Sequence, residues 1–299
     1  MRAVREFELL VPPELEGCTV EQALRRGLGL SDTRIKRAKF APEGITLDGA
    51  RVFTDHPVRA GQRLLLRLPD RGTVCWIETP GAVDIRYEDA WLMVVNKPAG
   101  LAVHPGPGHY ADTLGNRLAW LFRQRGEAFA FHPVNRLDRG TSGLMLAAKR
   151  PEAHEALQGL LHTEDFVREY LALTSGAPEP ARGEVAAPIA PVPGALNRYR
   201  VDGHGKAART AYETLERRGD AALVRLRLYT GRTHQIRVHM AHLGCPLLGD
   251  EVYGGPPGPQ WPALHSWRIR LRHPFTGQTL QWTAPLPAEL RALGWEVEA

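Results

Sequence analysis

Cysteine is scarce in this chain of 299 residues, and its three cysteines, Cys18, Cys75 and Cys245, lie far apart. They form no C-x-x-C pair, so they indicate neither a disulfide framework nor a cysteine-based zinc site, and they fit a reducing compartment. No stretch approaches the roughly 20 consecutive apolar residues that a membrane-spanning helix needs. The first residues are charged and lack the apolar segment of a signal peptide. We therefore expect a soluble cytoplasmic protein without membrane contact.

Several enzyme signatures are also missing from the sequence. It contains no G-x-x-x-x-G-K-[ST] phosphate loop, no G-x-G-x-x-G after an expected strand and no G-x-S-x-G elbow. His234, His239 and His242 are spaced by five and three residues, and no nearby carboxylate or cysteine completes a zinc-binding set. If the protein is an enzyme, a reaction without cofactor or metal is the simplest expectation.

Positive charge exceeds negative charge, which gives a net charge of +5 and an isoelectric point near 9.3. This balance favours a polyanionic partner such as nucleic acid or an acidic membrane surface. The excess is concentrated between Asp220 and Asp250, an interval that contains no acidic residue. The centre of this interval, residues 230–239, has the pattern of a strand-to-helix turn. Such a turn suits arginines and backbone N–H groups for binding phosphates, although a basic surface strand is the plain alternative.

Residues 1–70 look like a small separate unit, followed by a linker at residues 71–83 that is bracketed by Pro- and Gly-rich turns. A Thr cap predicts a helix over residues 19–26, and Ser31 or Asp32 can cap a second helix over residues 31–39. Short strands are expected near residues 44–48 and 63–68. The second helix carries four basic residues, Arg34, Lys36, Arg37 and Lys39. We interpret this small α/β unit as an RNA-backbone binder, with a solvated helix face as the alternative.

Residues 84–299 mix strands and helices, so the fold class that we expect is α+β. Apolar runs and alternating patterns predict strands at residues 91–96, 166–173, 223–229 and 267–271. Helices are predicted from Thr113 to about residue 124 and over residues 151–162. Residues 174–209 are rich in Gly, Pro and Ala without a strong period, which predicts long loops or a short hairpin.

The stretch from Asn135 to Gly143 places one acid, Asp138, between two arginines, Arg136 and Arg139. Neighbouring guanidinium groups favour the ionised form of a carboxylate, which suits it to act as a nucleophile or a base. A surface loop with a local ion pair explains the same residues without chemistry. Thr141 and Ser142 fit turn and capping positions better than nucleophilic ones, because no base lies close by in the sequence.

Taken together, several blocks of the chain resemble the RluA-type pseudouridine synthases, the family typified by enzymes of large-subunit ribosomal RNA. The similar blocks lie in the same order, roughly between residues 84 and 290, and are 97–105, 136–144, 168–173, 231–239, 248–254, 264–265 and 273–274. Residues 1–70 resemble, more loosely, the S4-like RNA-binding module shared with a small-subunit ribosomal protein. One departure is Asn135, where the family usually has a histidine; asparagine keeps hydrogen-bonding capacity but cannot titrate near neutral pH.

The resemblance implies a largely antiparallel sheet with flanking helices and an RNA-binding cleft, and the cofactor-free isomerisation of uridine to pseudouridine in RNA. It implies that Asp138 is the essential carboxylate, either as nucleophile at C1′ or as the base that removes a sugar proton. Tyr170 would stack on the uracil and help to move the C5 proton. Arg237 would pair with Asp138, with Arg232 as second choice, and Arg136 would hold the extruded nucleotide. The RNA-binding residues expected in total are Arg136, Arg139, Arg232, His234, Arg34, Lys36, Arg37 and Lys39.

Three other interpretations of the sequence stay open at this point. A non-catalytic RNA-binding or ribosome-assembly protein would share the basic surfaces, and a metal-dependent nuclease or other hydrolase would share the polyanionic substrate. A transfer-RNA pseudouridine synthase would share the chemistry, although ribosomal RNA is favoured by the family and by the N-terminal module. No obligate protein partner is implied, and we expect a monomer.

Overall fold

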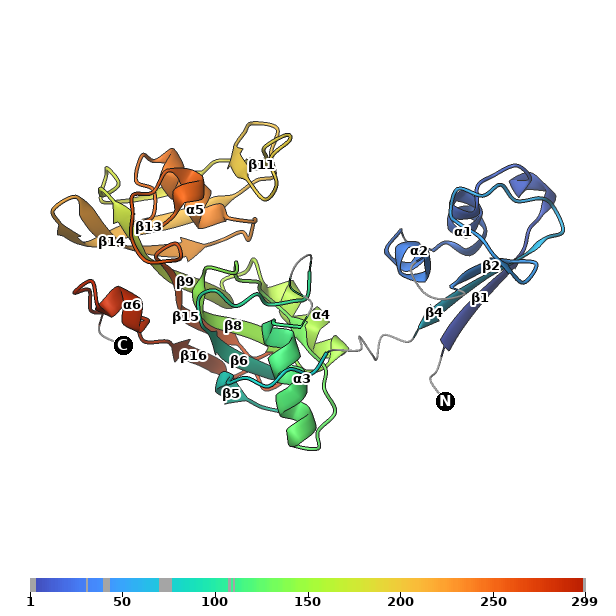
Figure 1. Ribbon diagram of the computed structural model, residues 1–299, viewed down its shortest axis with the longest axis horizontal. Helices are drawn as coiled ribbons and strands as arrows, with labels where there is room; N and C mark the ends of the chain where they lie inside the picture. Colours follow the sequence, from blue (N-terminus) through green and yellow to red (C-terminus); the bar gives the residue numbers. More distant parts are fainter. Residues whose placement is uncertain are drawn as a thin grey trace. The chain divides into compact units, whose positions relative to one another are not determined.

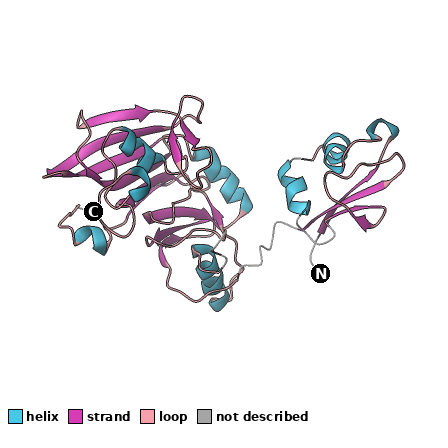
Figure 2. Ribbon diagram, turned by 45° about the horizontal axis from the view of Figure 1, so that its top comes forward, coloured by secondary structure: helices cyan, strands magenta, loops and turns pink. Residues whose placement is uncertain are grey.

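The computed structural model describes residues 4–30, 32–39, 44–69, 77–106, 109 and 111–297. By its internal contacts the chain divides into two compact units, Met1–Cys75 and Trp76–Ala299, each with its own hydrophobic core. Figures 1 and 2 show helices and strands in both units, with strands dominating the larger one. Within the described residues, no helix has both the length and the apolar character required to cross a bilayer.

The smaller unit packs two helices and a short 3-10 helix against a four-stranded antiparallel sheet of strand order β1-β4-β2-β3. Its elements are β1 (Val4–Leu10), η1 (Pro13–Leu15), α1 (Val20–Leu28), α2 (Asp32–Lys39), β2 (Ile45–Leu47), β3 (Ala50–Arg51) and β4 (Arg63–Pro69). Thr19 is the N-cap of α1: its hydroxyl accepts the Gln22 N–H, while the Gln22 side chain accepts the Thr19 N–H. This capping box satisfies two backbone donors at the helix start and confirms the predicted helix.

The predicted basic helix is α2, which turns Ile35 and Ala38 into the core of the smaller unit and leaves Arg34 exposed. Lys36, Arg37 and Lys39 also belong to α2, but their side chains, like the predicted Ser31 cap, lie outside the described residues.

The larger unit is built on a ten-stranded sheet with strand order β10-β13-β14-β9-β15-β8-β6-β5, to which β16 and β7 add at the sides. Its strands are β5 (Asp84–Glu88), β6 (Leu92–Lys97), β7 (His132–Pro133), β8 (Ser142–Ala148), β9 (Phe166–Ser175), β10 (Arg182–Ala186), β13 (Arg209–Arg218), β14 (Ala221–Leu228), β15 (Leu264–Arg272) and β16 (Thr279–Thr283). Its helices are α3 (Leu114–Gln124), α4 (Pro151–Leu160), α5 (Gln235–His242), η2 (Glu251–Tyr253) and α6 (Ala288–Arg291). The expected mixed α+β fold with a mostly antiparallel sheet is therefore confirmed for this unit.

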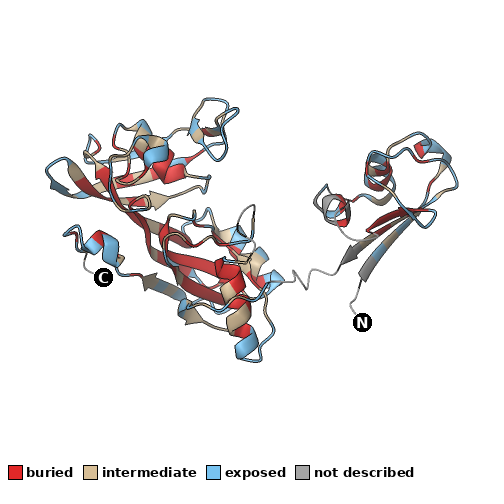
Figure 3. Ribbon diagram, in the orientation of Figure 1, coloured by how far each residue is buried: buried red, intermediate tan, exposed pale blue. Residues whose placement is uncertain are grey.

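The central strands of this sheet are buried on both faces, which explains their continuous apolar sequences (Figure 3). Along β8, Leu144 and Leu146 enter one core cluster while Met145 and Ala147 enter another, as the period of two requires. Helices α3 and α5 pack on the cluster that contains Met145, and α4 packs on the cluster that contains Leu144.

The segment from residue 174 to residue 209 is more ordered than its composition suggests. Strand β10 joins the edge of the main sheet beside β13, and a separate hairpin forms from β11 (Ile189–Pro191) and β12 (Tyr199–Val201). The hairpin matches the prediction, whereas the edge strand was missed. The reason is that β10 is specified by pairing with β13, some 27 residues later, and only Val185 of this strand is buried.

One parallel contact joins the two halves of the sheet. β15 pairs with β8 over only two residue pairs, His265 with Ser142 and Ser266 with Gly143, and this is the one parallel pairing among the described strands. Gly143 has φ +103°, and a Cβ at this position would lie 2.2 Å from the backbone oxygen of Ser266. The Ser142 hydroxyl meets His265 Nδ1 at 2.8 Å, and the Ser266 hydroxyl donates to the Leu144 carbonyl at 2.8 Å. Only glycine allows the two backbones to approach this closely.

We expect Gly143→Ala to lower the free energy of unfolding of the larger unit by about 3 kcal/mol or more, because the methyl group meets backbone atoms and φ is unfavourable. Gly159→Ala is a matched control: this glycine lies inside α4 with open space around it, and alanine there should gain up to about 1 kcal/mol. Urea unfolding followed by tryptophan fluorescence measures both, since all seven tryptophans belong to the larger unit. Equal stability of the two variants would contradict the role assigned to Gly143.

Candidate active site

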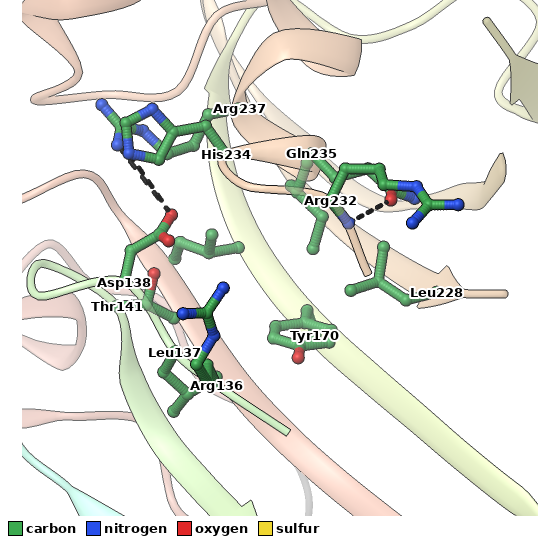
Figure 4. A pocket seen from close by; sticks show the side chains of 12 residues that line it. Arg136, Leu137, Asp138, Thr141, Tyr170, Leu228, Arg232, His234, Gln235 and Arg237 are labelled. Carbon is green, nitrogen blue, oxygen red and sulfur yellow. Dashed lines mark hydrogen bonds and ion pairs between the residues drawn. The ribbon is translucent and has the colours of Figure 1, made fainter. Parts of the chain in front are cut away.

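A pocket opens where three segments of the larger unit meet: the loop between β7 and β8, strand β9, and the turn that leads from β14 into α5 (Figure 4). Its lining combines one carboxylate, one phenol ring and several basic groups with an apolar floor. The lining residues are Arg136, Leu137, Asp138, Thr141, Tyr170, Leu228, Arg232, His234, Gln235, Ile236, Arg237 and Leu264. Five of the residues expected from the sequence to surround the target nucleotide are thus brought together with Asp138.

Asp138 presents a half-buried carboxylate to this pocket, with 30% of the side chain exposed. Its own carbonyl accepts the Thr141 N–H at 3.1 Å, which closes the turn before β8. Oδ2 of the carboxylate lies 3.9 Å from His234 Nε2 and 4.0 Å from Arg237 Nη1. The cation that faces the acid therefore comes from helix α5, about a hundred residues further along the chain.

Arg237 lies close to Asp138 as expected, but its strongest partner is a different acid. Its Nε and Nη2 donate to the two oxygens of Asp250, both at 2.7 Å, and both side chains are almost fully buried. Burial alone would lower the pKa of Arg237, but the bonds and the charge of Asp250 outweigh this and raise it. The bidentate pair fixes the guanidinium plane, so that Nη1 faces Asp138. The sequence marked Asp250 as the end of the interval without acids and as part of a family block, and its role as the partner of Arg237 was missed.

Tyr170 lines the pocket from strand β9 and is 4% exposed. Figure 4 shows its hydroxyl pointing away from Asp138, so the ring is the part that meets the pocket. Burial raises the pKa of Tyr170, while the charge of Arg168 and the Ser266 hydroxyl act against this shift. A ring with its edge fixed inside the sheet is suited to stacking against a planar group.

The two arginines beside Asp138 in the sequence do not surround its carboxylate. Arg139 donates from Nε to the Gly100 carbonyl at 3.0 Å, and its guanidinium lies 5.0 Å above the ring of Trp261. Arg136 is exposed at the pocket, and among the described residues neither arginine forms an ion pair with Asp138. The two guanidiniums are therefore not paired with the acid as the sequence suggested, because neighbouring residues of a turn point in different directions.

Lys97, the last residue of β6, bonds to the Asp138 loop, and the sequence analysis did not identify this role. It is 1% exposed, and its Nζ donates to the carbonyls of Pro98, Leu101 and Arg139 at 2.9, 2.8 and 3.1 Å. Burial lowers the pKa of Lys97 to about 7, against the opposing pull of the Asp138 charge. The Gly100 N–H also donates to the Arg139 carbonyl at 2.8 Å. The Lys97 turn and the Asp138 loop are therefore fastened together.

Asn135, the residue that departs from the family pattern, is a structural group in this loop. It is 4% exposed, and its Oδ1 accepts the Leu146 N–H of β8 at 2.8 Å. This bond holds the start of the Asp138 loop on the sheet and requires no titrating group.

The remaining sequence-predicted residues divide between the two units. Arg232 lines the pocket and donates from Nε to the Ala207 carbonyl at 2.9 Å. His239 is engaged by Thr210 and the Ala187 carbonyl, away from His234. No group of three or more His, Cys, Asp or Glu residues in the described part of the chain is arranged to hold a metal ion. Arg34, Lys36, Arg37 and Lys39 belong to α2 of the smaller unit.

Replacing Lys97 by methionine keeps the apolar stem and removes the donor, so we expect the larger unit to lose about 2 kcal/mol of unfolding free energy. Lys206→Met removes an exposed lysine and should change stability by less than about 0.5 kcal/mol. Urea unfolding followed by tryptophan fluorescence compares the two. A Lys97→Met protein as stable as Lys206→Met would show that the three bonds of Lys97 do not stabilise the fold.

Comparison with known proteins places this geometry in a family. A family model described as RNA pseudouridylate synthase matches residues 91–242, which include the whole pocket loop, β9 and α5. The chain is 36% identical over 295 residues to a ribosomal large subunit pseudouridine synthase D from Pseudomonas aeruginosa, covering 93% of this chain and 92% of that protein. A protein of the same name from Nitrosomonas europaea is 37% identical over 299 residues, with 96% and 86% covered.

Solved structures agree with the sequence relatives. The chain matches a structure described as human RNA pseudouridylate synthase domain containing 4 with a TM-score of 0.58 and 28% identity, covering 72% of this chain and 95% of that one. The non-catalytic and hydrolase interpretations of the sequence are thereby set aside. The chain belongs to the RNA pseudouridine synthase family and is an RNA pseudouridine synthase, an isomerase.

Proposed function

We propose that this enzyme converts uridines of large-subunit ribosomal RNA to pseudouridine, with Asp138 as the essential carboxylate. The observation that carries the proposal is the half-buried Asp138 carboxylate in a pocket that is also lined by the ring of Tyr170 and by the buried Arg237. The names of the relatives from Pseudomonas aeruginosa and Nitrosomonas europaea support the choice of ribosomal RNA. Transfer RNA is the competing substrate class.

The reaction needs no atom from outside the substrate and no change of oxidation state. The C1′–N1 bond of uridine breaks, a C1′–C5 bond forms, N1 gains a proton and C5 loses one. The Asp138 carboxylate takes part either by bonding to C1′ as N1 leaves or by removing a proton from the sugar. Both routes start from the ionised carboxylate and regenerate it at the end. Arg237 Nη1 lies 4.0 Å from Oδ2 of this carboxylate, on the α5 side of the pocket.

In this scheme the buried ring of Tyr170 stacks on the uracil. A second role for Tyr170, moving the C5 proton, would require its hydroxyl to leave the orientation seen in Figure 4. Stacking alone restricts the detached uracil to rotation within its own plane, which is the motion that exchanges N1 for C5. A flat, fixed ring at this wall is thus useful to the reaction without donating a proton.

The target uridine has to be extruded from its stack, at a cost of a few kcal/mol, before its C1′ can reach Asp138. Arg136 would occupy or brace the space that the nucleotide leaves, a role supported by its exposed position beside the acid. Arg232 on the opposite wall is suited to a phosphate contact. Arg139 is a weaker candidate than the sequence implies, because its guanidinium is already used by Gly100 and Trp261.

We also propose that residues 1–70 form an S4-like RNA-binding domain joined by residues 71–83 to the catalytic domain, residues 84–299. The basic helix α2 and the separate core of the smaller unit support this assignment. Its contribution would be electrostatic contacts with the RNA backbone, which raise affinity without selecting the uridine.

Asp138→Asn should abolish pseudouridine formation while changing RNA affinity by less than tenfold, roughly 1.4 kcal/mol, because only the charge of one oxygen pair is removed. The chromosomal copy of the protein is deleted, and either the wild type or the variant is expressed in its place. Pseudouridines are then mapped in the ribosomal and transfer RNA of both strains. We expect sites in large-subunit ribosomal RNA that appear only with the wild type. Sites confined to transfer RNA would overturn the substrate proposal, and full modification by Asp138→Asn would overturn the catalytic one.

Neutralising Arg34 and Arg37 together as glutamine should weaken RNA binding and flatten its salt dependence, by about 0.9 in the slope of log K against log salt for each phosphate that is no longer neutralised. A matched control is the double variant Arg270→Gln and Arg272→Gln, which removes two exposed charges of β15. Filter binding at several salt concentrations measures both proteins. An equal loss of affinity in the two would mean that α2 has no special part in RNA binding.

A further inference from the structure

His234 has an unusual backbone conformation at the start of helix α5. It is the N-cap residue, with φ +56° and ψ +20°, in the left-handed region that favours glycine. A side chain in this conformation costs free energy that the surrounding contacts must supply. The result of this geometry is that the imidazole enters the pocket beside Asp138, where its side chain is 14% exposed.

Both ring nitrogens of His234 face groups of the protein. Nδ1 lies 2.8 Å from the Tyr253 hydroxyl, and Nε2 lies 3.9 Å from Oδ2 of Asp138. The ring also meets Tyr199 and Tyr253 edge-on, with centroids 5.6 and 5.7 Å apart. A histidine that binds RNA phosphate would need an exposed nitrogen, so this geometry does not fit the RNA contact expected from the sequence.

The hydrogen bonds of Tyr253 favour one tautomer of this imidazole. The Tyr253 hydroxyl oxygen accepts the Tyr199 N–H at 3.1 Å, and its own proton needs an acceptor. Among the described residues Nδ1 of His234 is the acceptor within reach, and accepting that proton leaves the ring hydrogen on Nε2. Burial and the nearby Arg237 charge lower the pKa of His234, while Asp138 and Asp250 act against this. In this tautomer the Nε2–H of His234 is on the side of the ring that faces Asp138.

His234 and Arg237 both face the same oxygen of the Asp138 carboxylate. His234 Nε2 lies 3.9 Å from Oδ2, and Arg237 Nη1 lies 4.0 Å from it. We infer that His234 is a positioning residue, whose Nε2–H, set by Tyr253, acts with Arg237 to hold Oδ2 toward α5 and leave Oδ1 for the substrate. This inference rests on the proposed catalytic role of Asp138. It assigns to the Tyr253–His234 pair an effect on the chemical step rather than on RNA binding.

The test uses the full chain and an RNA fragment that contains a uridine converted by the wild type. Single-turnover rate constants and RNA dissociation constants are measured separately for His234→Gly, Tyr253→Phe and the double variant. Glycine removes the ring and is comfortable at φ +56°, so backbone strain does not obscure the result. The control is His242→Ala, which removes an exposed histidine from the last turn of the same helix.

We expect His234→Gly to lower the single-turnover rate constant by about thirtyfold and Tyr253→Phe by about fivefold, with RNA dissociation constants within threefold of the wild type. The double variant should be no slower than His234→Gly, because the Tyr253 hydroxyl affects the rate only through the His234 imidazole. His242→Ala should match the wild type. In addition, Tyr253→Phe keeps the packing of its ring, so its slower rate would not follow from a loss of fold.

Two results would overturn the inference. One is a wild-type rate in His234→Gly with a weaker RNA affinity, which would make His234 an RNA contact. The other is rate losses of His234→Gly and Tyr253→Phe that multiply in the double variant, which would mean that the two residues act independently. The parallel Asp138→Asn reaction separates the proposals: an active Asp138→Asn protein refutes the catalytic acid itself. An inactive Asp138→Asn with a wild-type rate in His234→Gly refutes only the positioning role.

Discussion

The close parallel contact between β8 and β15 is the constraint on which the site depends. It joins two halves of the sheet through two residue pairs, and Gly143 is the residue that permits the approach. Asp138 precedes β8 and so belongs to one half, whereas Tyr170, His234 and Arg237 belong to the other. The pocket therefore exists only while this seam is closed. Ser142 and Gly143, which follow the acid, belong to this backbone contact, and the Ser142 hydroxyl meets His265 across it.

Three cations or hydrogen-bond donors near Asp138 are each held in place by another group. Arg237 is held by Asp250, His234 by Tyr253, and Lys97 by three carbonyls. A buried ion pair such as Arg237 with Asp250 contributes little net stability, because desolvation offsets the attraction. Its value here is geometric: the guanidinium arrives already oriented, and no side-chain freedom has to be lost when the substrate binds.

The sequence predicted local structure well and long-range partners poorly. The Thr cap at Thr19, the run of apolar residues in β8 and the alternation of β15 are read from neighbours in the chain, and the structure confirms them. The family blocks, in contrast to these local patterns, suggested that Asp138, Tyr170 and Arg237 act together, and all three line one pocket. The pairing of Arg237 with Asp250 and the burial of Lys97 depend on how distant segments meet, and no local pattern records that.

The error at Arg139 has the same physical origin and clarifies what the motif does. Charge proximity along the chain suggested a guanidinium on each side of Asp138, yet a turn directs consecutive side chains apart. Arg139 binds the Gly100 carbonyl and stacks on Trp261, so it fastens the loop. Arg136 remains exposed at the pocket, with no ion pair among the described residues. Of the two arginines in the motif, Arg139 thus has a structural role. Arg136 is the one that can contact the polyanion favoured by the net positive charge of the protein.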